Sequence, residues 1–197
     1  PPGCPHEGYA IENALNYSVG FRAPNQQDLF SSFADHVIDT DSGQKRYTDH
    51  TLALRDSKGE LLQSETDKVK TLMQALLNND ELFKHWLGNT LSQAKHEMDL
   101  APLEEPITCE QMSDLITNNA EEFERLGGVR AIYQQLEDAL LLSINGENYP
   151  LPLCDLNAVT LLTDHDYVNT DDLNAAQPSL VFIQTFTTLV NEGMWFN

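Results

Sequence analysis

The protein has 197 residues, 41% of them hydrophobic, and its 31 acidic side chains outnumber 11 lysines and arginines, giving a formal net charge of −20. A chain of this length can bury a sizeable core in one large domain or two small ones. No apolar run reaches the ~18 to 20 residues that cross a bilayer. The negative charge opposes contact with nucleic-acid phosphates and attracts basic partners. We therefore expect a cytoplasmic protein that binds neither membranes nor nucleic acids.

The first predicted element is a strand at residues 14–21. Hydrophobic and small polar side chains alternate there with a period of two, the pattern of a strand with two different faces. The apolar face comprises Leu15, Tyr17, Val19 and Phe21, and the other face Asn16, Ser18 and Gly20. Pro24 and Asn25 end this strand, and the broad apolar stripe that follows predicts a helix over residues 25–38.

A long loop separates this helix from two others. Residues 39–63 are rich in Gly, Ser, Asp and Lys and show no hydrophobic periodicity. Helical order returns at Ser64, where S-E-T-D resembles a capping box. A further helix, carrying His85 and His96, is expected over residues 83–98. The three apolar stripes exceed what these helices need among themselves, so we expect them to pack on a neighbouring domain or on a second copy of the chain.

A proline-rich linker leads to a small α+β unit. Thr108 opens a helix with Gln111 at the reciprocal capping position, and residues 123–132 are extended around a Gly-Gly pair. The Asn-Gly pair at 145–146 is the strongest short signal for a hairpin. Two more helices are expected near 155–163 and 178–192. This order of helix, strands, hairpin and helices resembles a winged-helix arrangement.

Negative charge is concentrated in the second half of the chain. Residues 101–197 contain 16 acidic side chains and only two basic ones, Arg125 and Arg130, a net charge of −14. A DNA-binding domain needs a basic surface, so a winged-helix transcription factor is disfavoured. The acids at 121, 122 and 124 are interpreted as a solvated face.

The cysteines and most histidines suggest no site. Cys4, Cys109 and Cys154 are far apart without a C-x-x-C pair, which predicts reduced, buried thiols instead of disulfides or a zinc site. His85 and His96 would be about three helical turns apart, too far to bind one metal ion.

Recognisable catalytic motifs are scarce. G-x-S-x-G, H-E-x-x-H, a P-loop and G-x-G-x-x-G are absent from the sequence. Asp164, His165 and Asp166 could form an acid–base cluster, but they stand where a helix should end, so capping and solvation explain them more simply.

His6 has the most favourable setting for a metal ligand. The turn at Pro1-Pro2-Gly3 fixes the entry to a strand, and Pro5 stiffens the backbone directly before the imidazole. Metal sites need such positioning because their ligands must be held within tenths of an ångström. By composition alone, however, a single histidine is more often structural than a ligand.

The stretch PPGCPHEGYAIENALNYSVGFRAPN resembles the end of the double-stranded β-helix of the bacterial Jumonji-C (cupin-like) ribosomal oxygenases. The similarity continues through FKHWLGNTLSQAKHEMDLAP and the ERLGG segment and returns at LVNEGMWF, so it covers nearly the whole chain. The family comprises iron(II)- and 2-oxoglutarate-dependent hydroxylases. The type that this chain resembles modifies an arginine of ribosomal protein sixteen of the large subunit, while relatives modify a histidine.

The resemblance implies an α+β fold in three parts. These are the end of the Jumonji-C β-helix at 1–24, a helical dimerisation domain at 25–100, and a winged-helix-like domain at 101–197 that serves as a protein module. It implies that His6 is the distal histidine of the iron-binding triad and that Asn16 and Ser18 line the 2-oxoglutarate pocket. The implied partners are a basic ribosomal protein, as substrate, and a second copy of the chain. No residue is singled out as catalytic.

One motif of the family is missing. The triad also needs an H-x-D pair, with open positions on the metal for 2-oxoglutarate and oxygen. No H-x-D occurs in the 197 residues, since His96 begins H-E-M-D and Asp166 follows His165 directly. The chain is therefore expected to be the C-terminal part of such an oxygenase and to be inactive alone. The alternative is a non-catalytic, acidic module for dimerisation and protein interaction.

Overall fold

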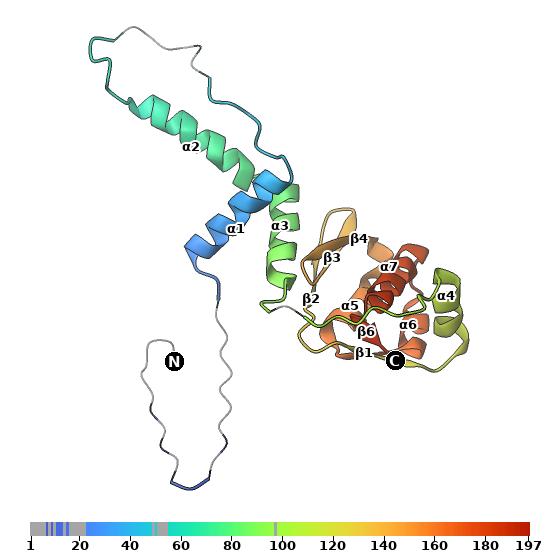
Figure 1. Cartoon of the computed structure of the whole chain (residues 1–197). Helices are drawn as coiled ribbons and strands as arrows, with labels where there is room; N and C mark the ends of the chain where they lie inside the picture. The colour runs from blue at the N-terminus through green and yellow to red at the C-terminus, as the bar shows by residue number, and fades with distance from the viewer. Residues whose placement is uncertain are drawn as a thin grey trace.

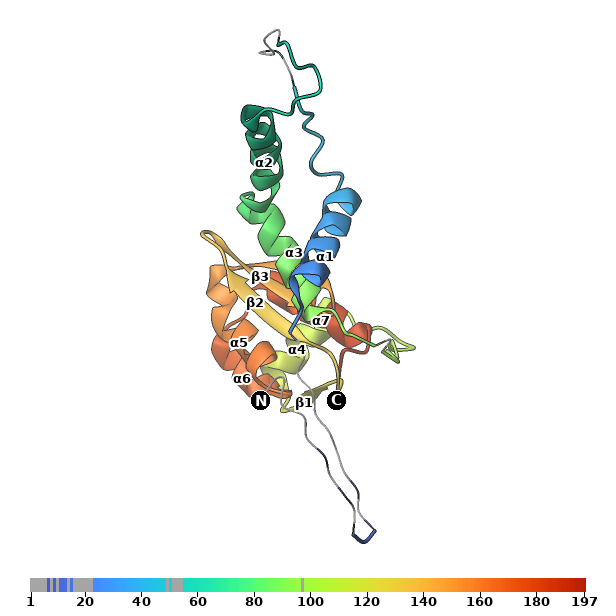
Figure 2. The ribbon, with the colours of Figure 1, turned by 90° about the vertical axis from the view of Figure 1, so that its left-hand side faces the viewer.

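The computed structural model describes residues 7, 9, 11–13, 15, 23–48, 50, 55–96 and 98–197. Over these residues the chain forms a helical arm and an α+β body (Figure 1). The arm comprises α1 (Gln26–Asp39), α2 (Gln63–Leu77) and α3 (Asp80–Ser92). Figure 1 and Figure 2 show α2 standing clear of the body, while α3 lies against it. Of the strand predicted at 14–21, only Leu15 is among the described residues.

The base of the arm is a small aromatic cluster. Asn25 caps α1 by accepting from the backbone amides of Gln27 and Asp28 at 2.8 and 3.0 Å, and the Asp28 carboxylate accepts from the Asn25 amide. The capped helix presents Phe33 to Trp86 of α3, with ring centroids 5.1 Å apart in an edge-to-face arrangement. This favourable ring geometry, together with the burial of both side chains, holds α1 against α3.

Helix α2 begins at Gln63, one residue before the predicted start. Its first turn is closed by the Glu65 carboxylate, which accepts from the Leu62 amide at 2.8 Å, so the expected S-E-T-D box starting at Ser64 is wrong in detail. No residue of α2 is fully buried. Val69 and Met73, one turn apart, are 46% and 55% exposed. The arm therefore carries an apolar face that the described part of the chain leaves open.

Helix α3 is shorter than the sequence suggests. It ends at Ser92, and Gln93 follows in an extended conformation (ψ 130°). His85 lies within α3 but His96 lies beyond it, so the prediction of one helix through residue 98 is wrong. The apolar periodicity in the sequence extends beyond the end of α3 because Ala94 and Met98 are also apolar. Both residues belong to the connection that leads into the body.

Over the described residues, the body combines four α-helices with two three-stranded sheets. Its first part comprises α4 (Cys109–Asn118), β1 (Glu122–Arg125), β2 (Ala131–Gln135), β3 (Ala139–Ile144), β4 (Glu147–Pro152) and the 3-10 turn η1 (Leu153–Asp155). Its second part comprises α5 (Leu156–Asp164), β5 (Tyr167–Asn169), α6 (Thr170–Ala176), α7 (Leu180–Asn191) and β6 (Trp195–Phe196). The sheets have the orders β2-β3-β4 and β5-β1-β6, with all neighbours antiparallel. Helix α3 of the arm packs on the first sheet.

Local signals in the body are confirmed. Thr108 and Gln111 form the reciprocal capping box of α4. Asn145 and Gly146 both have positive φ, 48° and 89°, and join β3 to β4 with Ile144 opposite Glu147. Two consecutive positive φ values are the signature of the tight hairpin turn that Asn-Gly favours.

Strand β3 is buried on both faces. Leu140, Leu142 and Ile144 belong to the main core, together with Phe123, Phe182, Phe186 and Trp195. Leu141 and Ser143, on the opposite face, are also fully buried. That second face is covered by α3. The run ALLLSI thus lacks alternation because the strand has no solvent-facing side.

Polar contacts fix α3 to this sheet. The Asn148 amide donates to the His85 carbonyl at 2.9 Å and the Gly146 amide donates to the Ser92 hydroxyl at 3.0 Å. The Gln134 amide donates to the Lys84 carbonyl at 2.8 Å. These bonds run along the whole helix, so α3 is integral to the packing of the body.

The connection after α3 is bound to the end of α7. The Leu103 amide donates to the Asn191 carbonyl at 2.9 Å. The Asn191 side chain accepts from the Ile107 amide and donates to the Ile107 carbonyl, both at 2.9 Å. Gly193 follows with φ +76°, and its Cα faces the backbone of Ala101. Residues 101–107 are thus positioned by α7.

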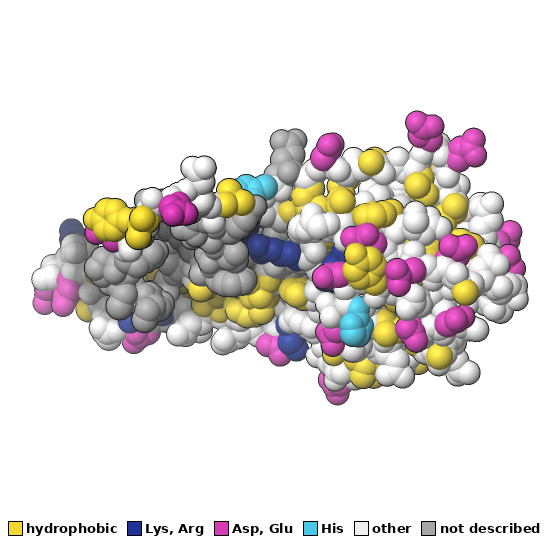
Figure 3. Space-filling view, turned by 90° about the horizontal axis from the view of Figure 1, so that it is seen from below, with side chains coloured by type: hydrophobic (Ala, Val, Ile, Leu, Met, Phe, Trp, Pro, Cys, Tyr) yellow, Lys and Arg dark blue, Asp and Glu magenta, His cyan; other side chains and the backbone are white. Residues whose placement is uncertain are grey.

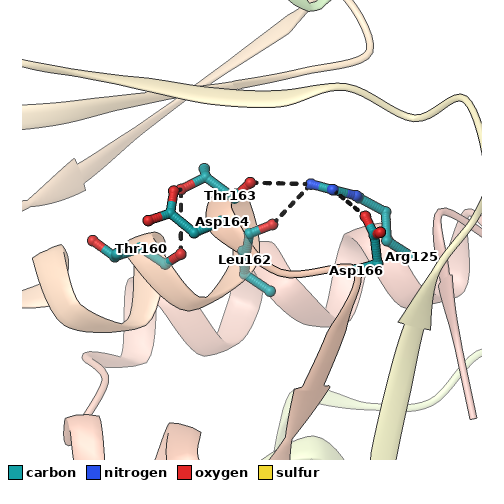
Figure 4. A network of polar contacts seen from close by, with 6 residues as sticks. All are labelled: Arg125, Thr160, Leu162, Thr163, Asp164 and Asp166. Carbon is teal, nitrogen blue, oxygen red and sulfur yellow. Dashed lines mark hydrogen bonds and ion pairs between the residues drawn. The ribbon is translucent and has the colours of Figure 1, made fainter.

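Arg125 closes the C-terminal end of α5 (Figure 4). Its guanidinium donates to the Leu162 and Thr163 carbonyls at 3.1 and 3.4 Å and to the Asp166 carboxylate at 2.6 Å. Carbonyls in the last turn of a helix lack intrahelical partners, and a cation there satisfies them. Asp166 is therefore committed to Arg125, which favours the structural interpretation of residues 164–166.

The sequence predicts buried cysteines, but neither of the two described cysteines is fully buried. Cys154 is exposed on η1, and Cys109 is half-buried at the start of α4. Neither forms a disulfide among the described residues. In this part of the chain, every helix is too short or too polar to serve as a membrane span.

Candidate functional site

The three site residues predicted from the sequence, His6, Asn16 and Ser18, lie outside the described residues. Within the described ranges, no group of three or more His, Cys, Asp or Glu side chains is arranged to hold a metal ion.

A groove lies where the arm meets the body. Its volume is about 1440 Å³, and its lining includes Ala23 and Pro24. Cationic and anionic side chains share its walls, namely Asp28, Lys95, His96, Asp99 and Arg130. Figure 3 shows Lys and Arg side chains at this junction, between the arm and the strongly acidic body. The junction is thus the most basic part of this view.

The loop at Gly127-Gly128 forms one wall of this groove. Gly128 has φ +100°, a left-handed conformation that L side chains rarely adopt, and an added Cβ at either glycine would meet nothing within 4 Å. Gly128 therefore permits the turn between β1 and β2, and the two glycines place no side chain on this wall of the groove.

A second groove, of about 710 Å³, lies on the arm between α2 and the loop that precedes it. Its walls include Lys45, Arg46, His50, Asp67 and Lys68.

On helix α1, burial lowers the pKa of His36, and the charge of His85 acts in the same direction. Both effects favour the neutral imidazole of His36 in the folded chain.

Helices α6 and α7 follow one another through a short turn in which Gln177 has φ 52°, the order of elements in a helix-turn-helix. In DNA-binding proteins the second helix of this motif enters the major groove. Here α7 contains no charged residue, and α6 contributes Asp171 and Asp172. The helix pair therefore offers no cation to phosphates, and that this unit is not a DNA reader stays a prediction.

The family described as ROXA-like winged helix matches residues 75–196, well over half of the chain. The chain belongs to the ROXA-like winged-helix family. The match begins inside α2, so the ROXA-like winged helix includes α3 as well as the sheet that α3 covers.

Proteins similar to this ROXA-like winged helix are ribosomal oxygenases. The Ribosomal protein uL16 3-hydroxylase of Escherichia coli (strain K12) is 38% identical over 196 residues, which is all of this chain and 51% of that protein. A solved structure of YcfD, a ribosomal oxygenase from Escherichia coli, has a TM-score of 0.83 at 35% identity and covers 95% of this chain and 50% of that chain. The structure of YcfD with cobalt and 2-oxoglutarate has a TM-score of 0.82 at 35% identity, over the same shares. The chain thus spans about half the length of these relatives.

Proposed function

We propose that this chain is the C-terminal part of an iron(II)- and 2-oxoglutarate-dependent oxygenase that hydroxylates an arginine of the ribosomal protein uL16. The observation that carries the proposal is the 38% identity to a uL16 hydroxylase along the whole chain, with no region left unmatched. The similar oxygenase YcfD has been solved with cobalt and 2-oxoglutarate, and cobalt is a common stand-in for iron(II). The net charge of −20 would attract a basic ribosomal protein.

His6 would supply one neutral imidazole to the iron, and Asn16 and Ser18 would line the 2-oxoglutarate pocket. An iron triad needs three protein ligands, and the 197 residues contain no H-x-D pair to supply the other two. These residues alone therefore do not make an iron site, and the remaining ligands would come from outside them. When bound, iron and 2-oxoglutarate would activate oxygen for hydroxylation, whereas this chain's described residues would support the site and recruit the substrate.

The test begins with the complete reading frame. We expect the sequence upstream of the Pro1 codon to encode H-x-D on an alternating strand. With iron(II), 2-oxoglutarate and a uL16 peptide, the complete protein should add one oxygen atom to an arginine, located by tandem mass spectrometry. His6→Ala should abolish the product, because one of three iron ligands is lost, while His50→Ala in the arm should leave it unchanged.

Two results would contradict this proposal. Full hydroxylation by His6→Ala would remove His6 from the metal site, and 2-oxoglutarate decarboxylation by the isolated 197 residues would show that they need no further ligands. If the reading frame encodes no H-x-D, the chain is instead a non-catalytic interaction module.

We also propose that the arm mediates homodimerisation. Helix α2 has no fully buried residue, and its exposed stripe continues through Val69, Met73 and Leu77 at helical spacing. Phe30 and Ile38 of α1 are exposed as well, at 58% and 73%. Apolar surface of this extent usually contacts another protein surface, and two-fold pairing of identical faces is the commonest solution.

Met73→Glu should shift the protein from dimer to monomer in analytical ultracentrifugation, because the substitution places a charge in the centre of the apolar stripe. Gln74→Glu adds the same charge to the neighbouring exposed position of α2 and should leave the dimer intact. Equal sedimentation of the two variants would rule out this face as the dimer contact.

A further inference from the structure

The sheet β5-β1-β6 has one face in the core and one open face. Phe123, Val168 and Trp195 point inward and are at most 3% exposed. Because side chains alternate along a strand, the residues between them point outward. The outward set is Glu122, Glu124, Tyr167, Asn169 and Phe196. The described structure places nothing over this face.

Three of these outward residues form one row across the sheet. Glu124 of the central strand is directly opposite Tyr167 of β5 on one side and Phe196 of β6 on the other. Tyr167 is 52% exposed and Phe196 is 42% exposed. The row therefore presents two aromatic rings with a carboxylate between them. We call this row, together with Glu122, the aromatic–carboxylate face.

The charges around this face all have the same sign. Glu122 and Glu124 have no ion-pair partner among the described residues. Asp166 stands beside Tyr167 and is paired with Arg125, whose guanidinium lies toward the end of α5. In Figure 3, acidic side chains gather around exposed hydrophobic ones at this end of the body. The face is thus acidic and aromatic, and its two glutamates have no ion-pair partner among the described residues.

The pKa of Tyr167 reflects the negative electrostatic potential of this face. The pKa of its hydroxyl is raised by a hydrogen bond to Glu124 and by the negative charge of Glu124, with smaller effects from burial, Glu122 and Asp166. The negative potential that opposes ionisation of the phenol also attracts a cation.

The spacing of the row suits a single cation. Neighbouring strands are about 4.8 Å apart, so β5 and β6 lie roughly 10 Å apart across β1. A cation above Glu124 would lie one strand spacing, about 5 Å, from the backbone of each flanking strand. Aromatic rings attract cations within ~6 Å of the ring centroid, so the side chains of both flanking strands can contribute. A guanidinium group fits best, because it is planar, stacks on rings and pairs with a carboxylate at the same time.

We propose that the aromatic–carboxylate face is a docking site for an arginine side chain in a basic segment of a partner protein. Charge complementarity selects this occupant. The acidic body of a second copy, with a net charge of −14 over residues 101–197, would be repelled from this face, as would nucleic acid or an anionic membrane. The two flanking rings offer no ligand atoms to a bare metal ion, so this face would bind such an ion no better than any solvent-exposed pair of carboxylates. The site lies in the body and acts whether or not the chain forms part of an oxygenase.

The test uses the 197-residue chain and a fluorescein-labelled peptide in which arginines alternate with serine and glycine, followed by fluorescence anisotropy. Glu122→Gln/Glu124→Gln should weaken binding about tenfold, and Tyr167→Leu about threefold, because the first removes the charges and the second only the ring. Tyr167→Phe keeps the ring and should bind as the parent does. A peptide with citrulline in place of arginine, equal in shape but neutral, should not bind.

The matched control removes two acids elsewhere. Glu137 and Asp138 are exposed in the turn between β2 and β3, away from the second sheet. Glu137→Gln/Asp138→Asn changes the net charge as much as the double variant of the face does and should leave the affinity unchanged. Equal weakening by both pairs would show general charge attraction and overturn the proposal. Unchanged binding by Tyr167→Leu, with the fold verified by circular dichroism, would overturn the role of the rings.

Discussion

Replacing Gly193 with alanine should lower the free energy of unfolding by about 3 to 5 kcal/mol, the largest effect we expect from adding one methyl group. Gly193 has φ +76°, and a Cβ there would come within 2.4 Å of the Ala101 carbonyl oxygen and 2.7 Å of its carbon. Both atoms belong to the backbone of the connection that α7 binds through Asn191. Neither can rotate away, so the connection itself must move. Urea unfolding followed by circular dichroism measures the loss.

Gly128→Ala is the matched control for this substitution. Gly128 has φ +100° but an added Cβ would meet nothing within 4 Å. Its replacement therefore carries only the backbone strain, about 1 to 2 kcal/mol. The amount by which Gly193→Ala lowers the free energy of unfolding more than Gly128→Ala does is the contribution of the close approach to Ala101. If the two variants unfold at the same urea concentration with the same slope, the close approach contributes nothing to stability.

Replacing Gly88 with alanine should lower the free energy of unfolding by about 2 to 3 kcal/mol, although alanine is the better helix former by about 1 kcal/mol. A Cβ on Gly88 would lie 2.2 Å from the Ser143 hydroxyl oxygen and 2.9 Å from Oδ1 of Asn148. Those two oxygens are 2.6 Å apart in a hydrogen bond, and Asn148 also donates to the His85 carbonyl. The methyl group would therefore disrupt the contact between α3 and the sheet. Thermal and urea unfolding would both report the loss.

A second substitution tests this cause. In Gly88→Ala/Ser143→Ala the colliding oxygen is gone, and the Cβ of residue 143 would lie 3.2 Å away, a contact that small shifts relieve. The double variant should recover part of the lost stability relative to Gly88→Ala, a coupling that separate sites do not show. Gly127→Ala, with nothing within 4 Å of its Cβ, should be neutral or slightly stabilising. A stabilised Gly88→Ala would mean that helix propensity outweighs the packing at this position.

Local sequence signals predicted much of the body. The Asn145-Gly146 turn and the Thr108–Gln111 capping box are confirmed because each depends on residues only a few positions apart. The helix α1, the α5 and α7 helices and the α+β class are confirmed as well. In such segments the backbone preference and the tertiary packing agree.

Features set by distant contacts could not be predicted in this way. Helix α6 has only seven residues and follows the three-residue strand β5, so neither is long enough to show a hydrophobic period. The end of α3 at Ser92 coincides with a hydrogen bond from Gly146, fifty-four positions later. The packing role of Gly88 is likewise invisible until Ser143 lies beside it.

The candidate sites divide in the same manner. The predicted roles of His6, Asn16 and Ser18 come from resemblance and remain predictions, because those residues lie outside the described part of the chain. The aromatic–carboxylate face was missed, since the acids at 122 and 124 were interpreted as a solvated surface. Alternation in E-F-E-R gave the outward positions of Glu122 and Glu124, but Tyr167 and Phe196 join them only through strand pairing.

Strand β3, buried on both faces, sets a limit on how this protein can be divided and recombined. A gene fusion that began at the linker after α3 would keep every strand of the body yet expose the face of Leu141 and Ser143 to water. The smallest unit that keeps its core intact on recombination is therefore the winged helix with α3 included. Recombination breakpoints that persist should fall before Asp80. The family match, which starts at residue 75, has this extent.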